Sequence, residues 1–136
     1  MGIKLEIVTP TEKTFSGDVD TVTIPGIVGE LGVLEMHAPL ITTIKPGELY
    51  YYVDGTEHGL AIGDGFVEVT PHQVNVVTDM AAGEHEIDEA ATEDAIQRAQ
   101  KAMEGDHNDE EVAFLEASIA KSIAKLEFKR RRRKHL

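Results

Sequence analysis

The 136-residue chain contains no cysteine, so it forms no disulfide and no thiolate metal site, and its redox compartment is left open. It also has no apolar run long enough to span a bilayer. The first residues, MGIKLEIVTP, lack the long apolar segment of a secretory signal and are typical of a strand. Any association with a membrane is therefore expected to go through another protein or through surface charge.

The charges are unevenly distributed along the chain. The formal net charge is −12, yet residues 125–136 (KLEFKRRRRKHL) hold seven Lys or Arg and one acid, a local charge of +6. The rest of the chain therefore carries −18. A strongly acidic body with a basic end presents two different electrostatic surfaces.

Residues 1–82 have the pattern of a β-domain. Ile3, Leu5 and Ile7 alternate with charged residues, as in a half-buried strand. A β-branched segment from Val19 to Ile24 predicts another strand, which ends at Pro25-Gly26. Further short apolar runs are separated by the turn signals Asp54-Gly55, Gly63-Asp64-Gly65 and Thr70-Pro71. Many short strands with no intervening helix predict an antiparallel sandwich or barrel.

Residues 83–136 change to a helical pattern, because glycine becomes sparse and alanine frequent. Asp88 is expected to cap a helix that continues to about Met103. A break at residues 105–108 separates it from a second helical segment. The chain is therefore predicted to be α+β, with an N-terminal antiparallel β-sandwich or barrel followed by a C-terminal two-helix hairpin.

The second helix is expected to begin after Asn108, which with Glu111 makes a variant of the capping box. An apolar stripe at helical spacing follows, formed by Val112, Leu115, Ile119, Ile123 and Leu126. If Asp109–Lys134 is all helical, it reaches roughly 39 Å at 1.5 Å per residue. One such stripe can serve two packings, either folded back on the β-domain or extended along a partner.

The segment Gly29–Leu40, GELGVLEMHAPL, combines glycines, a proline and charged residues between strand-like segments, which is typical of an exposed loop. Glu30, Glu35 and His37 can be interpreted as a general acid–base group or as a docking rim. Catalysis is disfavoured, since no GxSxG, HExxH or P-loop motif accompanies them. The six histidines are scattered without metal-ligand spacing, so no zinc site is expected.

The basic tail, Lys129–Lys134, has three interpretations. It can bind nucleic acid or anionic lipid, but the acidic body opposes both, and only Phe128 would offer a stacking surface. It can be a solvated helix end. It can also dock on an acidic protein surface, and its cations suit the negative end of their own helix.

The sequence resembles the epsilon subunit of bacterial F-type ATP synthase, which is similar to the delta subunit of mitochondria. The resemblance is carried by GELGVLEMHAPLITTIKPGEL and GDGFVEV, and it extends from LEIVTP near the start to the terminal helix. One position departs from the family: a glycine usually precedes His-Ala-Pro where this chain has Met36.

The resemblance implies a non-catalytic rotor subunit in the central stalk of a proton-translocating ATP synthase. Residues 1–82 would bind the gamma subunit and the c-ring, with Glu30 and His37 facing the polar loops of the ring. Such a subunit would be peripheral, on the cytoplasmic face of a bacterial plasma membrane, and would bind no nucleic acid. The lack of an Arg- and Ser-rich transit segment favours a bacterial or organelle-encoded protein.

The resemblance further implies that residues 83–136 are regulatory. In related bacterial proteins the hairpin either folds against the sandwich or extends along gamma, where it blocks ATP hydrolysis. Its basic end would then contact acidic segments of the catalytic beta subunits. In this chain the corresponding cations are Lys125, Lys129, Arg130, Arg131, Arg132 and Arg133.

Some family members bind ATP in the folded hairpin through an Ile-Asp-x-x-Arg-Ala motif. Ile87-Asp88 is present here, but Ala91 replaces the arginine, which removes a cation for phosphate. Arg98 stands where a second arginine occurs. The acidic residues around this helix also oppose a nucleotide's charge, so weak ATP binding or none is expected, and no cofactor.

The alternative is a stand-alone β-sandwich adaptor whose basic tail binds an acidic partner. An adjacent gene for the beta subunit of ATP synthase would distinguish the two hypotheses. An enzyme ranks last, because its acids would have to be assembled by a cleft that the sequence does not indicate.

Overall fold

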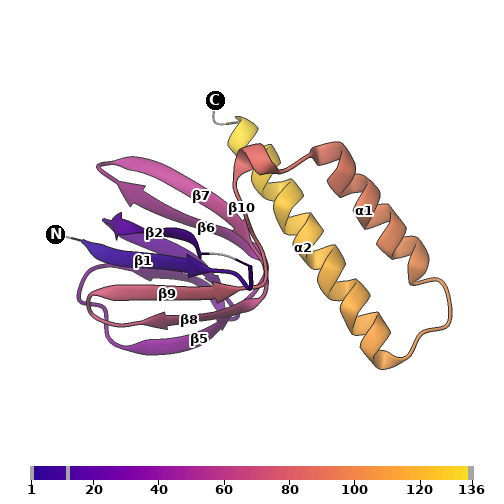
Figure 1. Ribbon diagram of the computed structural model, residues 1–136, viewed down its shortest axis with the longest axis horizontal. Helices are drawn as coiled ribbons and strands as arrows, with labels where there is room; N and C mark the ends of the chain where they lie inside the picture. Colours follow the sequence, from indigo (N-terminus) through magenta and orange to yellow (C-terminus); the bar gives the residue numbers. More distant parts are fainter. Residues whose placement is uncertain (1, 12, 135–136) are drawn as a thin grey trace.

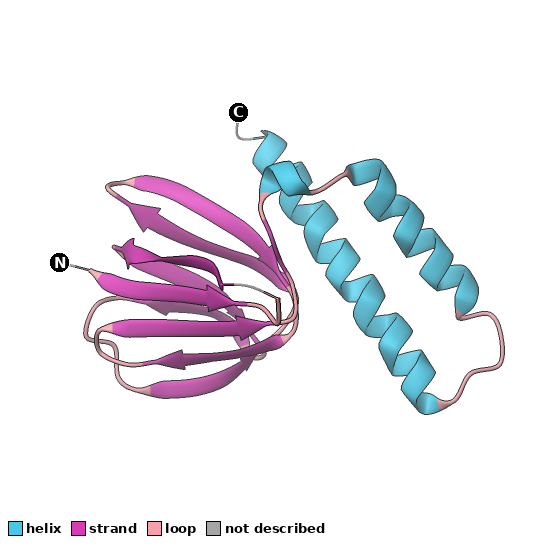
Figure 2. Ribbon diagram, viewed as in Figure 1, coloured by secondary structure: helices cyan, strands magenta, loops and turns pink. Residues whose placement is uncertain are grey.

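The computed structural model describes residues 2–11 and 13–134, and shows a β-barrel followed by two helices (Figures 1 and 2). The strands are β1 Ile3–Val8, β2 Lys13–Val19, β3 Thr21–Gly26, β4 Gly29–Val33, β5 Leu40–Ile44, β6 Gly47–Val53, β7 Thr56–Ile62, β8 Gly65–Val69, β9 Gln73–Thr78 and β10 Ala81–Ala82. A short 3-10 turn, η1 Glu84–Glu86, leads to the helices α1 Glu89–Ala102 and α2 Asp109–Lys134. The predicted α+β order is confirmed.

The strands form one sheet in the order β10-β7-β6-β3-β5-β8-β9-β1-β2, with β4 paired to β3. The predicted antiparallel pairing holds for every pair of described strands except one. Strands β1 and β9 are parallel, with Leu5 opposite Val74. Parallel neighbours need a long connection, which here is the intervening sheet itself. Local sequence patterns do not show such a distant pairing, and the predicted antiparallel sandwich or barrel is otherwise confirmed.

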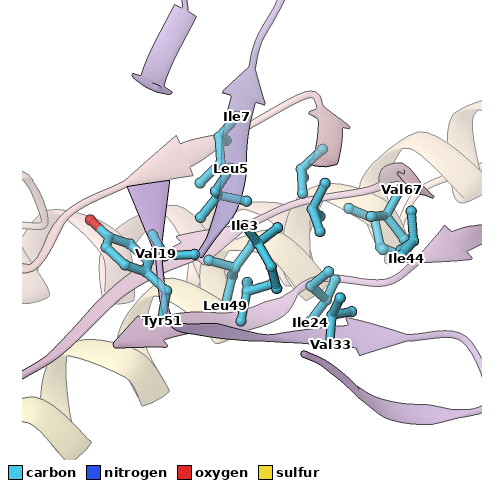
Figure 3. Packing of buried hydrophobic residues seen from close by; sticks show 14 of the residues in the cluster. Ile3, Leu5, Ile7, Val19, Ile24, Val33, Ile44, Leu49, Tyr51 and Val67 are labelled. Atoms are coloured by element: carbon cyan, nitrogen blue, oxygen red, sulfur yellow. The ribbon is translucent and has the colours of Figure 1, made fainter. Parts of the chain in front are cut away.

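The barrel core is built from the inward half of each alternating strand (Figure 3). Ile3, Leu5 and Ile7 are at most 1% exposed, which confirms the alternation read from the sequence. They pack with apolar residues from the other strands, namely Val19, Val22, Ile24, Val33, Ile44, Leu49, Tyr51, Ile62, Val67, Val69, Val74 and Val76. The outward half of each strand is therefore available for contacts with the hairpin or with partners.

The strand predicted from Val19 to Ile24 is divided between two strands. Val19 ends β2 and β3 starts at Thr21, because the chain reverses at Asp20, whose Oδ2 accepts a hydrogen bond from the Asp54 backbone N–H at 2.9 Å. Strand β3 also continues through Pro25 and Gly26, where the sequence predicted its end. The Pro25 carbonyl accepts a hydrogen bond from Lys45 N at 3.0 Å, which continues the pairing at this end of the strand.

The hairpin predicted at Asp54-Gly55 is confirmed. It joins β6 to β7, and both turn residues have positive φ, 50° for Asp54 and 80° for Gly55. This is the backbone twist that a two-residue hairpin requires.

Both helices begin where the sequence predicted. The Asp88 carboxylate caps α1 by accepting from Ala91 N at 3.1 Å, and Asn108 Oδ1 accepts from Glu111 N at 2.8 Å. Only this half of the expected capping box is seen at α2. The Glu111 carboxylate is instead 2.8 Å from His107 Nδ1, so it does not reach back to the cap.

The hairpin is folded back, and α2 lies between α1 and the barrel (Figure 1). Helix α2 contacts strands β6 and β7 and the η1 turn. Its predicted apolar stripe is only partly covered: Leu126 is buried, whereas Ile123 remains 39% exposed. The long helix therefore rests on the barrel mainly through its C-terminal half.

Candidate functional site

The Gly29–Leu40 segment is only partly the loop that the sequence predicted. Its first half is strand β4, which pairs with β3 so that Glu30 lies opposite Pro25. The second half, Leu34–Pro39, connects β4 to β5. The sequence did not predict this strand, because only Leu31 and Val33 face inward and the other residues are glycine or charged.

Glu30 is an exposed side chain on the outer surface of the barrel. The Tyr50 hydroxyl, on β6, donates a hydrogen bond to Glu30 Oε2 at 3.1 Å. Partial burial and this hydrogen bond raise the pKa of Tyr50, so the tyrosine stays a donor at neutral pH. Glu30 is thus held by a neighbour and still faces solvent.

His37 is half-buried in the β4–β5 connection, with Nδ1 2.7 Å from the Ala38 carbonyl oxygen. The connection is tied to the barrel by a hydrogen bond from Met36 N to Pro71 O at 2.8 Å. Met36 has φ +67°, in the left-handed region that favours glycine. The one departure from the family pattern therefore falls on a position whose backbone suits the family's glycine.

The structure does not gather Glu30, Glu35 and His37 into one cluster. Glu30 lies three residues before the end of β4 at Val33, which is roughly 10 Å of strand. His37 lies beyond that end, in the connection to β5. Among the described residues no hydrogen bond or ion pair joins any two of the three. An acid–base group needs its members within hydrogen-bond reach, so the arrangement fits a docking rim.

Exposed apolar side chains flank this segment at both ends. Val28 is 96% exposed at the β3–β4 turn, and Ile41 is 69% exposed at the start of β5. Ile27, Leu34, Met36 and Leu40 are exposed as well. We call residues 27–41 the rim. Exposed apolar side chains gathered beside charged ones are typical of a surface that binds another protein.

The cations of the basic tail contact the chain's own acids, although the side chains of Arg130, Arg131 and Arg133 stay about half exposed. Arg132 is 3.2 Å from Glu48 Oε1 and 3.0 Å from Glu57 Oε2, on β6 and β7. Arg131 also pairs with Glu48. These ion pairs lie within the chain, and docking of the helix end on another protein stays a prediction.

Arg133, Arg130 and Lys129 contact α1 and η1. Arg133 lies 3.0 Å from the Glu89 carboxylate, and Arg130 pairs with Glu93. Lys129 Nζ donates to the Glu84 carbonyl at 3.0 Å. His135 and Leu136, which follow the tail, lie outside the described residues.

Lys125 is separate from the arginines. It lines a pocket of about 260 Å³ between the two helices, together with Asp88 and Ala91. Arg98 does not line this pocket but is exposed and paired with Asp94 at 3.1 Å. The structure thus does not bring Asp88 and Arg98 together, and the Asp88 carboxylate already caps α1.

In the described part of the chain, no helix is both long and apolar enough to cross a bilayer. The family model of the β-sandwich domain of the ATP synthase delta/epsilon chain matches residues 2–84, which is the whole barrel. The chain belongs to the ATP synthase delta/epsilon chain family. As a member of this family it is a non-catalytic subunit of ATP synthase.

Named relatives cover nearly the whole chain. The ATP synthase epsilon chain of Herpetosiphon aurantiacus is 38% identical over 133 residues, which are 98% of this chain and 98% of the relative. The epsilon chain of Dehalococcoides mccartyi is 39% identical over 134 residues, 98% of this chain and 96% of the relative. The sequence similarity to these relatives therefore extends over the helical hairpin as well as the barrel.

A solved structure of the Euglena gracilis mitochondrial ATP synthase, containing OSCP, F1 and the c-ring, includes a similar chain. The TM-score is 0.77 at 25% identity, over 93% of this chain and 79% of that one. A chain in the central stalk and c-ring of the Tetrahymena thermophila enzyme shares the fold, with a TM-score of 0.54 at 14% identity over 63% of this chain and 69% of that one.

Sequence reasoning missed Tyr50, Glu48 and Glu57 as partners of the predicted site residues. The available signal was the alternation of β6, which places Glu48, Tyr50 and Tyr52 on the outer surface. Nothing in that alternation tells which element covers the outer surface, so Glu48 would have been read as a solvated acid.

Proposed function

We propose that the chain is a central-stalk rotor subunit of a proton-translocating F-type ATP synthase, peripheral to the cytoplasmic face of a bacterial plasma membrane. Residues 1–82 form the docking unit for the gamma subunit and the c-ring, and residues 83–136 form the regulatory unit. The observation that carries this proposal is the rim, with its exposed apolar side chains beside Glu30 and His37. Its bacterial relatives, which are epsilon chains, support it.

In this proposal Glu30 and His37 are contacts to the polar loops of the c-ring. An exposed acid facing basic loops gives register and a faster encounter more than it gives raw affinity. The apolar side chains at either end of β4 supply the buried area. The proposed partners are therefore proteins of the same complex, and no nucleic acid.

The basic tail, with Lys125, is proposed to inhibit ATP hydrolysis by contacting acidic segments of the catalytic beta subunits. Deletion of Lys129–Leu136 tests this in the assembled enzyme, where the rate of ATP hydrolysis should rise. Substitution of Arg130–Arg133 by glutamine is the control that removes charge without shortening the helix, and it should have the same effect. An unchanged rate in both variants would contradict the inhibitory contact.

We propose that ATP binds the folded hairpin weakly or not at all. In support, Ala91 stands where the motif has its arginine, and Arg98 is paired with Asp94 away from the pocket between the helices. Lys125 is the only cation among the described residues that line this pocket. Isothermal titration of the full chain with ATP measures the affinity. A dissociation constant in the micromolar range would contradict the proposal.

A further inference from the structure

We propose that the tip of the helical hairpin is a docking site for a basic, amphipathic segment of a partner protein, which places one apolar side chain beside Phe114. We call residues 102–115 the tip. It lies at the opposite end of α2 from the basic tail and projects away from the barrel (Figure 1). The site is therefore separate from the rim and from the tail, and it does not depend on the function proposed above.

Phe114 is an apolar side chain that the fold leaves uncovered. It is 74% exposed, more than Phe66 at 48% and Tyr52 at 36%, which are the other exposed aromatic residues in the described part of the chain. Its neighbour Leu115 belongs to the apolar stripe of α2 and is half-buried. Because successive side chains on a helix are rotated by about 100°, Phe114 lies outside that stripe. It contributes little to the packing of the hairpin and is available to a partner.

A pocket of about 360 Å³ opens beside Phe114. It lies where the two helices are joined, between Ala102 at the end of α1 and Leu115 on α2. Ligand pockets in proteins range from roughly 300 to 1,000 Å³. This pocket is therefore large enough to take an apolar side chain of a partner, with the Phe114 ring as one of its walls.

Polar contacts hold the walls of the pocket in place. His107, whose side chain is 20% exposed, is hydrogen-bonded to the Ala102 carbonyl oxygen, and its Nδ1 is 2.8 Å from Glu111 Oε2. Asn108 Oδ1 accepts a hydrogen bond from Glu111 N at 2.8 Å. These contacts tie the connection between the helices to both of them. A partner meets a preformed pocket, so little conformational entropy is lost in ordering it.

The charges around the pocket select a basic partner. Residues 104–111 (EGDHNDEE) hold five acids and no Lys or Arg, and all five acids are exposed. The nearest cation along the chain is Lys101, which leaves the tip strongly negative. Complementary charge speeds the encounter with a basic segment and disfavours an acidic one. A Lys or Arg of the partner can also lie over the Phe114 ring in a cation–π contact.

The chain's own basic tail is the other candidate occupant, supplied by a second copy. Its arginines are already paired with acids of their own chain, among them Glu48, Glu89 and Glu93. Binding to the tip of another copy would have to break these pairs. The observations therefore favour a different protein.

NMR spectroscopy of the isotopically labelled full chain, titrated with a synthetic helical peptide of lysine and leucine, tests the site. We expect the largest shift changes in residues 102–115. Phe114→Ala should weaken the binding about tenfold, which corresponds to 1.4 kcal/mol. Phe66→Ala is the matched control, because Phe66 is an exposed phenylalanine on β8 of the barrel, and it should bind like the parent chain. Shift changes spread over the acidic surface, with equal affinity for Phe114→Ala and the parent chain, would overturn the proposal.

The choice of a basic partner is tested separately from the pocket. Glu110→Gln should weaken binding of the same peptide several-fold, whereas Asp18→Asn removes one exposed charge from β2 and should have little effect. A peptide of glutamate and leucine with the same spacing should not bind. Equal binding of the two peptides at the tip would show that charge does not select the partner.

Sedimentation equilibrium of the parent chain without peptide tests the second copy as occupant. We expect a monomer over the concentration range of the titration. A dimer that Phe114→Ala dissociates would make a second copy of the chain the occupant and overturn the proposal.

Discussion

Tyr50 on β6 donates a hydrogen bond to Glu30 on β4 at 3.1 Å, and the strand between them is β3. The hydroxyl thus reaches across one strand to orient the acid on the next. Glu30 keeps its second oxygen and its exposure, so it is oriented without being neutralised. This geometry suits an acid that meets a cation on another protein.

Glu30→Lys should weaken docking to the c-ring several-fold, because charge reversal on a rim changes the association rate and its salt dependence. Biolayer interferometry with the detergent-solubilised ring over a salt series measures this. Tyr50→Phe is the control that keeps the charge and loses only the orienting hydrogen bond, so its effect should be smaller. Parent-like binding of Glu30→Lys at every salt concentration would exclude Glu30 from the contact.

Met36→Gly should stabilise the barrel. The left-handed backbone at Met36 costs a non-glycine residue about 1–2 kcal/mol, and the greater flexibility of unfolded glycine returns about 0.5–1 kcal/mol of that. A gain of up to about 1.5 kcal/mol in the free energy of unfolding is therefore expected, since the exposed Met36 side chain has little packing to lose. Urea denaturation gives the value.

Met36→Val is the control for this prediction, because a branched side chain at the same positive φ is a stronger outlier and should lower the free energy of unfolding. A glycine variant less stable than the parent chain would show that the conformation carries no strain.

Phe128→Ala should detach the hairpin and leave the barrel folded. Truncation of a buried phenylalanine typically costs about 3–5 kcal/mol, and this one fastens α2 to Ala61, Ala82 and Ile87. Hydrogen exchange should rise in residues 112–134 and stay unchanged in β9. Equal acceleration in both segments would mean that the two parts unfold together.

Gly59→Ala tests the same attachment from the barrel. A Cβ at Gly59 would lie 3.0 Å from the Phe128 ring and closer still to the Arg132 guanidinium. The Arg132 guanidinium is the end of a flexible side chain and can shift, whereas the buried Phe128 ring has less room to give, so exchange in α2 should accelerate. Gly32→Ala, whose Cβ would meet nothing within 4 Å, is the control.

His107 should make the tip of the hairpin sensitive to pH. The hydrogen bond to Glu111, followed by that to the Ala102 carbonyl, raises the pKa of His107 above its usual value. Because the folded pKa is the higher one, the stabilising charge is fully present below about pH 6.5, the unfolded value, and is lost as the pH rises through the folded pKa.

An NMR titration of the His107 ring measures its pKa. Glu111→Gln should lower the pKa toward the usual value, whereas Glu110→Gln, one residue away and not paired with the ring, should change it less. Identical titration curves for the parent chain and Glu111→Gln would show that Glu111 does not raise the pKa of His107.

Local patterns predicted most elements and missed pairings that join distant segments. The alternation of Ile3, Leu5 and Ile7 arises because only one face of their strand is buried, so the sequence predicted that strand. The helix starts were also predicted, because Asp88 and Asn108 each cap a helix by binding a backbone N–H three residues further on. The parallel β1–β9 pair and the Tyr50–Glu30 hydrogen bond join segments that nothing local connects.

The sequence by itself determined that an acidic β-domain precedes a helical hairpin with a basic end, since periodicity, turn residues and charge are local properties. It also singled out the segment Gly29–Leu40 and the basic tail, whereas the exposed apolar residues at either end of that segment came from the structure. Only the tertiary structure decided that β4 separates Glu30 from His37 and that Arg131 and Arg132 meet Glu48. The physical reason is that burial and pairing depend on which surface α2 covers, and that choice is made by the packing of whole elements.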